Sequence, residues 1–159
     1  MSGRFVAFAL ALALTAAAAL PALAEAPGPA MLQTFIGSWK GQGAFNGGDS
    51  GKTNCRLVFK AKGANVVYSG RCSAGLGSQT FSGTLAYNTK TRQFEAHSRD
   101  AAVAGKVVAD AIVFDLATDS DRGHARSIMS FAPTGITIDL TLTDEKSEVT
   151  TAHIAFLKS

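Results

Sequence analysis

Three histidines and two cysteines are the side chains in this sequence best suited to metal binding or nucleophilic chemistry. His97, His124 and His153 are far apart in the chain, and no H-E-x-x-H motif or Cys/His spacing typical of a metal site includes them. No Gly-x-Ser-x-Gly motif marks a nucleophilic serine. The sequence therefore predicts no metal site and no catalytic residue, and we expect that the protein is not an enzyme.

The two cysteines, Cys55 and Cys72, are predicted to form a structural disulfide. A two-residue turn at Gly63–Ala64 would pair Lys62 with Asn65, and the same register places Cys55 directly opposite Cys72. This register also separates an apolar face of the hairpin from a basic one. Because disulfides persist in oxidising compartments, the pair favours a periplasmic or secreted protein.

Asp110 is the ionisable residue most able to act on a ligand. It lies inside the apolar run Val107–Phe114, within a segment that we predict to be one strand over 106–116. If its side chain points inward, it needs a polar partner such as His97 or Arg126, and it could then anchor a polar group of a ligand. The alternative is a side chain that points outward into water.

The first 24 residues have the pattern of a secretory signal peptide. Arg4 supplies the positive charge, Phe5–Leu20 is apolar, and Ala22–Ala24 offers the small residues of a cleavage site. A retained membrane anchor is the alternative, although the apolar run is short for a spanning helix. No later apolar stretch is long enough to span a bilayer as a helix.

Residues 25–159 are expected to form a lead-in and one domain. The lead-in covers 25–35, with one short helical turn over Ala30–Phe35, and the domain covers 36–159. Beyond residue 24 the chain has 14 basic and 12 acidic side chains, a net charge of +2. This weak excess gives no electrostatic reason to expect nucleic-acid binding.

The segments that must position these residues are predicted to be strands joined by short polar turns. Nine strands are expected, near 38–45, 53–61, 65–73, 79–87, 92–99, 106–116, 124–131, 135–143 and 148–157. Eight to ten strands joined in this way favour an all-β, antiparallel up-and-down barrel, because closure removes the exposed edges of the sheet. A β-sandwich is the alternative.

The last two strands have two possible registers, which place His153 differently. If paired residue numbers sum to 292, Leu140 faces Ala152 and His153 lies opposite Asp139 on the outer face. If they sum to 291, His153 faces Ile138 inside the barrel. The first register buries more apolar surface and is therefore predicted.

A barrel of this size either holds one small ligand or is filled by its own side chains. The candidate ligand-binding side chains in the lumen are Phe59, Tyr68, Phe81, Tyr87, Phe94, Ile138 and Leu140, together with Asp110. Inward-facing small residues that would leave room for a ligand are Gly70, Gly83, Ala96 and Ala111. We expect a small apolar or amphipathic ligand. The rival is a protein with a packed lumen that acts through its surface on a protein partner, as a protease inhibitor or an envelope accessory factor.

The opening Gly37-Ser38-Trp39-Lys40-Gly41-Gln42-Gly43 resembles the Gly-x-Trp pattern of calycins, the lipocalins and their relatives. The resemblance implies a barrel whose closed end is plugged by Trp39, with Lys158 from the last strand packed over the ring. The extended Gly-x-Trp-x-Gly-x-Gly is similar to nitrobindin-like barrels. That resemblance implies a haem cofactor bound through a histidine near the C-terminus, which would be His153 here.

The early disulfide and the Gly-x-Trp opening are also similar to bacterial metalloprotease inhibitors of the Inh type. Those inhibitors block the protease with an extended N-terminal arm. The resemblance implies that residues 25–35 form such an arm and that the protein partner is a protease.

Overall fold

The computed structural model describes residues 28–48, 50–74, 77–99, 101–121 and 123–159. The predicted signal peptide and the beginning of the predicted lead-in lie outside the described residues. Within the described residues, no helix is both long and apolar enough to cross a bilayer.

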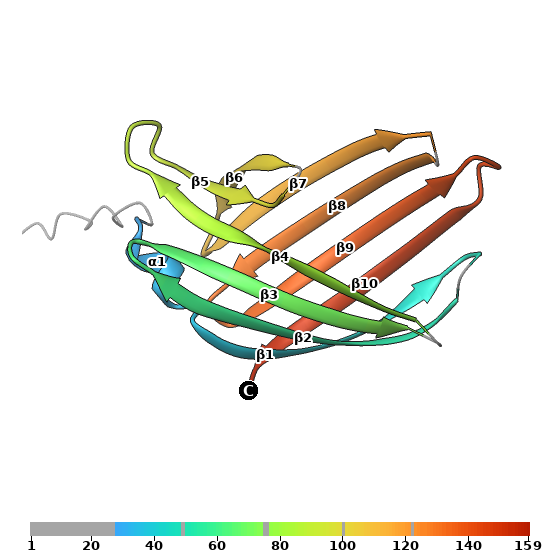
Figure 1. Cartoon of the computed structure of the whole chain (residues 1–159), viewed down its shortest axis with the longest axis horizontal. Helices are drawn as coiled ribbons and strands as arrows, with labels where there is room; N and C mark the ends of the chain where they lie inside the picture. The colour runs from blue at the N-terminus through green and yellow to red at the C-terminus, as the bar shows by residue number, and fades with distance from the viewer. Residues whose placement is uncertain (1–27, 49, 75–76, 100, 122) are drawn as a thin grey trace, which may run out of the picture.

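Ten antiparallel strands form a closed up-and-down barrel in the described part of the chain (Figure 1). They are β1 Gly37–Asn46, β2 Gly51–Lys62, β3 Asn65–Ala74, β4 Gly77–Asn88, β5 Gln93–His97, β6 Ala102–Val108, β7 Ala111–Ser120, β8 Gly123–Ala132, β9 Gly135–Asp144 and β10 Val149–Lys158. Each strand pairs with its neighbours in sequence, and β1 closes the barrel against β10. The predicted all-β barrel is confirmed.

A single helical turn, α1 (Ala30–Gln33), covers the end of the barrel where β1 begins (Figure 1). Leu32 and the following Phe35 are fully buried, and Trp39 from the start of β1 is 1% exposed. Burying these side chains closes this end of the barrel, because large apolar groups gain most by leaving water. The predicted short helical turn is confirmed, and we call this end the closed end.

The hairpin of β2 and β3 has the predicted register. Cys55 is paired with Cys72 and Lys62 with Asn65, so Gly63 and Ala64 form the turn. Gly63 takes a φ of 62°, the sign that the first position of a type II′ turn requires. The register of β9 and β10 is confirmed as well, since His153 is paired with Asp139.

The prediction of one strand over 106–116 is wrong. The chain turns back at Ala109 and Asp110, so that Val108 ends β6 and Ala111 begins β7. Ala109 takes a φ of 54°, a left-handed conformation that alanine seldom adopts, and this is why the sequence did not signal a turn. The described part of the chain therefore has ten strands, one more than the nine segments expected from the sequence and within the predicted range of eight to ten.

The prediction that Gly70 and Gly83 leave room in the lumen is also wrong. A methyl group on Gly70 would meet the ring of Phe81 at 2.3 Å, and one on Gly83 would meet the hydroxyl of Tyr68 at 2.4 Å. An aromatic ring from the neighbouring strand packs directly on each glycine, so the space that the missing side chain would leave is already filled. The other two small residues, Ala96 and Ala111, lie in the buried core and directly after the turn at Ala109 and Asp110, respectively.

Candidate ligand-binding site

A cavity of about 580 Å³ occupies the half of the barrel that lies away from α1. Its wall comes from nearly every strand and is mostly apolar: Phe45, Thr53, Leu57, Phe59, Tyr68, Cys72, Gly77, Ser78, Gln79, Phe81, Ser82, Ser98, Leu116, Ser127, Met129, Phe131, Ile138, Leu140 and Ile154. Its volume and apolar lining are typical of sites that hold one small molecule.

The floor of the cavity is a cluster of aromatic rings that fills the closed end. Phe59 and Phe131 meet edge to face at a centroid distance of 6.2 Å, and Phe35 from the lead-in packs on both rings. Phe114 lies against Phe131 at 5.6 Å. Such aromatic contacts favour particular ring orientations, so the floor is a well-packed base for the cavity.

A few polar groups interrupt the apolar wall. They include the side chains of Tyr68, Gln79 and Ser127, which lie on different strands. Burial raises the pKa of the Tyr68 phenol, so the hydroxyl stays protonated over the whole physiological range and can donate a hydrogen bond. The cavity can therefore orient a ligand that carries an acceptor group on an apolar body.

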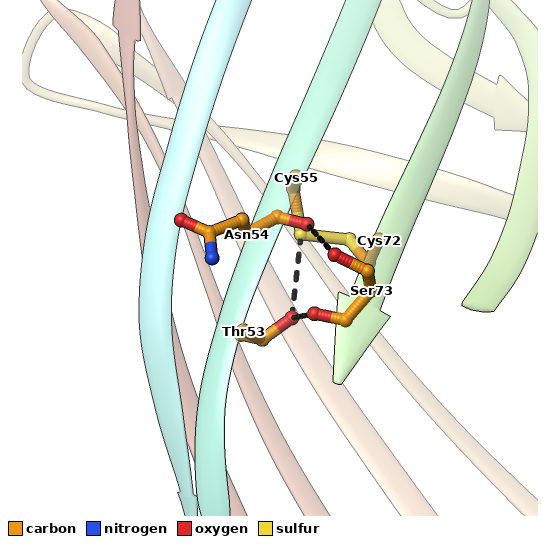
Figure 2. The surroundings of a disulfide bond; sticks show 5 residues. All are labelled: Thr53, Asn54, Cys55, Cys72 and Ser73. Carbon is orange, nitrogen blue, oxygen red and sulfur yellow. Dashed lines mark hydrogen bonds between the residues drawn. A yellow bond between two sulfur atoms is a disulfide. The ribbon is translucent and has the colours of Figure 1, made fainter. Parts of the chain in front are cut away.

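The disulfide forms part of the wall, and its bond between Cys55 and Cys72 is confirmed (Figure 2). The hydroxyl of Thr53 donates to the carbonyl of Ser73 at 3.0 Å, and the hydroxyl of Ser73 donates to the carbonyl of Asn54 at 3.3 Å. Thr53 is buried with its hydrogen-bonding capacity used across the hairpin. Together, the covalent and hydrogen bonds fix β2 to β3 beside the cavity.

The strand ladder of the wall is interrupted between the first half of β4 and the second half of β7, and we call this gap in the ladder the lateral opening. Strand β5 reaches only Thr84–Asn88 of β4, and β6 reaches only Ala111–Val113 of β7. The first half of β4 and the second half of β7 therefore have no strand between them, as the short β5 and β6 in Figure 1 illustrate. Ser82 of β4 and Ser98, at the tip of the β5–β6 hairpin, line this side of the cavity.

Five of the predicted lumen residues line the cavity. These are Phe59, Tyr68, Phe81, Ile138 and Leu140. Tyr87 and Phe94 do not line it. They pack against each other at the closed end of β4 and β5, with a centroid distance of 5.0 Å, and Phe94 is buried in the core. The prediction that they line the lumen is therefore wrong for these two residues, because both lie at the closed end, on the far side of the aromatic floor from the cavity.

Asp110 does not point into the lumen, contrary to the ligand-anchoring hypothesis. It lies in the exposed turn between β6 and β7. Its two suggested partners have others: Arg126 donates to Asp115 through Nε at 3.0 Å and Nη2 at 2.7 Å, and His97 contacts Glu95. The turn at Ala109 reverses the chain, so the alternation expected of a single strand does not apply.

His153 lies on the outer face of β10, and its side chain is 64% exposed. Its Nδ1 is 2.6 Å from a carboxylate oxygen of Asp139. His97 and His124 also lie outside the cavity lining. A haem bound in the lumen would therefore find no imidazole at any of these three positions. Among the described residues, no group of three His, Cys, Asp or Glu side chains is placed to hold a metal ion.

The structure places Trp39 and Lys158 together at the closed end. The indole Nε1 of Trp39 donates to the carbonyl of Phe35 at 2.8 Å. Lys158 Nζ lies 5.6 Å from the centre of the indole ring and donates to the carbonyl of Thr34 at 2.9 Å. These contacts tie the lead-in, the first strand and the last strand to one another.

Sequence reasoning missed much of the wall contributed by the second half of the chain. Met129, Phe131, Leu116 and Ile154 line the cavity without having been named as candidates. Strand β8 has apolar residues on both faces, with Ile128 beside Met129, so alternation alone did not identify its inner face. The pairing of Met129 with Ile138 does identify it.

Comparisons with known proteins identify the fold. No protein-family model matches the chain. No curated protein matches it either. The structure of the S-type phycobiliprotein lyase CPES from Guillardia theta is similar, with a TM-score of 0.59 and 14% identity over 82% of this chain and 91% of that one. Rv2717c from M. tuberculosis matches with a TM-score of 0.58 and 14% identity over 84% and 98%.

At this level of identity the two neighbours show the fold alone. They do, however, correct the expectation that the protein is not an enzyme. One of them is named a lyase, so an enzyme uses a barrel of this kind. The missing catalytic motifs in this sequence therefore do not exclude catalysis, since the chemistry of a site does not follow from its fold.

Proposed function

We propose that this protein binds a small apolar or amphipathic molecule in the lumen of its barrel. The observation that carries the proposal is the cavity of about 580 Å³ above the aromatic floor. An apolar cavity of this size forgoes the contacts that side chains make in a packed core, and a ligand would restore them. The open lumen favours this function over the rival, a packed protein that acts through its surface.

The lining indicates how such a ligand is held. Apolar contacts from Leu57, Phe81, Met129 and Leu140 would supply most of the affinity, and the Tyr68 hydroxyl would donate to an acceptor group. The proposal concerns a ligand held by apolar contacts, because His153 is outside the lumen and offers no support for haem ligation. Catalysis on the bound molecule is compatible with the same site.

We also propose that the protein works outside the cytoplasm. The disulfide between Cys55 and Cys72 supports this location, because such bonds are rare where thiols are kept reduced. The signal-peptide pattern of residues 1–24 supports it as well. Expression of the full chain in a bacterium, followed by N-terminal sequencing of the periplasmic fraction, tests whether the chain is cleaved after Ala24.

The lumen is tested with N-phenyl-1-naphthylamine, a neutral dye that fluoresces in apolar surroundings. We expect saturable binding to the oxidised protein. Ser127→Trp places a large ring among Leu116, Leu140 and the other lining residues, and it should weaken binding about tenfold or more. Thr141→Trp adds the same ring to the outer face of β9 and should leave binding unchanged.

Circular dichroism and thermal melting show whether each variant folds, and Leu116→Trp is a second blocking variant if Ser127→Trp does not. Equal dye affinity in the wild type and in a folded blocking variant would contradict binding in the lumen. The absence of any saturable binding would do the same for ligands of this class.

A further inference from the structure

The outer surface of the barrel is divided by charge. Strands β1 to β4 carry no Asp or Glu among their described residues, and six basic side chains point outward from them: Lys40, Lys52, Arg56, Lys60, Lys62 and Arg71. The opposite side has acidic residues paired with basic ones, such as Asp115 with Arg126 and Asp139 with His153. One side thus carries charges of both signs, and the described strands of the other carry only basic side chains.

Three of these cations stand side by side across the strands. Lys40 is paired with Arg56 between β1 and β2, and Arg56 is paired with Arg71 between β2 and β3. Like charges directly opposite one another in a sheet are destabilising. An anion bound over this row would offset that repulsion. The row of cations is therefore consistent with an anion-binding site.

A groove of about 740 Å³ runs over this part of the surface. Arg56, Arg71 and Arg99 all line it, and no acidic residue does so among the described residues. Arg71 donates from Nη2 to the hydroxyl of Ser78 at 2.8 Å, which holds its guanidinium toward β4. Guanidinium groups are well suited to carboxylates and phosphates because they donate two parallel hydrogen bonds.

The groove meets the lumen at the lateral opening of the barrel. Phe81, Ser82 and Ser98 line both the groove and the internal cavity. Phe81 and Ser82 belong to the part of β4 that β5 does not cover, and Ser98 follows β5 directly. One ligand can therefore contact the apolar interior and the arginines outside if it passes over the exposed edge of β4.

We propose that the groove formed by Arg56, Arg71 and Arg99 binds the anionic head of an amphipathic ligand whose apolar chain occupies the lumen. The head is a carboxylate or a phosphate. This inference rests on the proposed function, because it needs the lumen to hold the chain. It adds that the ligand enters through the side of the barrel, over the part of β4 that β5 does not cover and beside the tip of the β5–β6 hairpin.

The test compares ligands that share one chain and differ in their head. Dodecanoate, dodecyl phosphate and dodecanol are titrated against protein loaded with N-phenyl-1-naphthylamine, below their aggregation limits and at pH 7.5. We expect the two anions to bind about tenfold more tightly than the alcohol in 50 mM salt. Since exposed charges are screened by salt, the difference should shrink at 500 mM.

Arg71→Gln and Arg99→Gln should each lower the preference for the anions severalfold while leaving dodecanol affinity unchanged. Lys60→Gln removes the same charge from the outer face of β2 beyond the groove, and it should keep the preference. Inorganic phosphate alone should displace little dodecanoate, because it lacks the apolar chain.

Equal affinity for dodecanoate and dodecanol, unaffected by the arginine variants, would overturn this inference and leave lumen binding intact. Efficient competition by inorganic phosphate would also overturn it, since the groove would then be a site for a free anion. If neither the dye nor any of the three chains binds, the proposed function fails together with the inference.

Discussion

Lys158 combines two contacts in one side chain at the closed end of the barrel. Its ammonium group lies over the Trp39 ring and donates to the carbonyl of Thr34. Lys158→Met keeps the alkyl chain and removes both contacts, so we expect the free energy of unfolding to fall by about 1 kcal/mol. Lys158→Arg keeps the charge and should recover most of the loss in urea unfolding. A methionine variant as stable as the wild type would show that the two contacts contribute nothing.

Asp115 links stability to pH. Its pKa is held below the ordinary range chiefly by the hydrogen bonds from Arg126. The folded protein therefore gains stability above the pKa of the unfolded carboxyl, about 4, and loses this gain as the pH falls through the lower folded value. We expect Asp115→Asn to lower Tm at pH 7 and to melt progressively closer to the wild type as the pH drops below 4. Asp110→Asn, in an exposed turn, is the control, and a constant difference down to pH 2 would contradict the linkage.

At the scale of elements, the turn between β6 and β7 is strained at one residue. Ala109 takes a φ of 54°, which costs an L-residue about 1 kcal/mol and costs glycine almost nothing. Ala109→Gly should therefore raise the free energy of unfolding by up to about 1 kcal/mol. Ala104→Gly, in the middle of β6, should lower it by about 0.5–1 kcal/mol. Urea unfolding measures both, and a destabilising Ala109→Gly would contradict the assigned strain.

The hairpin of β2 and β3 depends on its covalent link. Cys55 and Cys72 are separated by 17 positions, and closing a loop of this length in the unfolded chain is worth about 3 kcal/mol. The double variant Cys55→Ala with Cys72→Ala should lose about that much stability in guanidinium unfolding. Adding a reductant should weaken the wild type toward the same value and leave the double variant unaffected. If the stability of the wild type did not change on reduction, the disulfide would not have the stabilising role assigned to it.

The same elements show how far prediction from the sequence can go. The Cys55–Cys72 hairpin was predictable because a glycine turn and two cysteines independently indicate one register. The turn at Ala109 and Asp110 was not, because alanine occupies the position with positive φ and seldom adopts that conformation. One missed turn was enough to place Asp110 wrongly in a strand.

At the scale of the whole molecule, the candidate site was harder to predict than the fold. Alternation along β9 identified Ile138 and Leu140 as inward, and both line the cavity. Whether space remains between inward residues depends on rings from neighbouring strands, such as Phe81 over Gly70. The lateral opening depends in turn on how short β5 and β6 are. The space left in the lumen and the lateral opening both depend on several strands together, so neither can be predicted from one segment of the sequence.

Closure of the barrel through β10 is the whole-molecule feature most open to test. Ending the chain after Ser147 removes Ile154 and Phe156 from the core and leaves one edge of β1 and one edge of β9 unpaired. We expect this truncation to abolish the cooperative thermal transition and the near-ultraviolet signal of Trp39. Removing Ser159 alone should leave both nearly unchanged. A truncated chain that melts cooperatively would show that closure is dispensable.

The pairing of β1 with β10 also imposes an order in time. Synthesis and export along the chain both deliver β1 before β10, so β1 waits for nearly the whole domain before its ladder with β10 is complete. The β2–β3 hairpin needs only its own two strands and can be cross-linked long before then. The lumen is consequently the last part of the molecule to come into being, and a newly made chain can take up a ligand only after its final strand has docked.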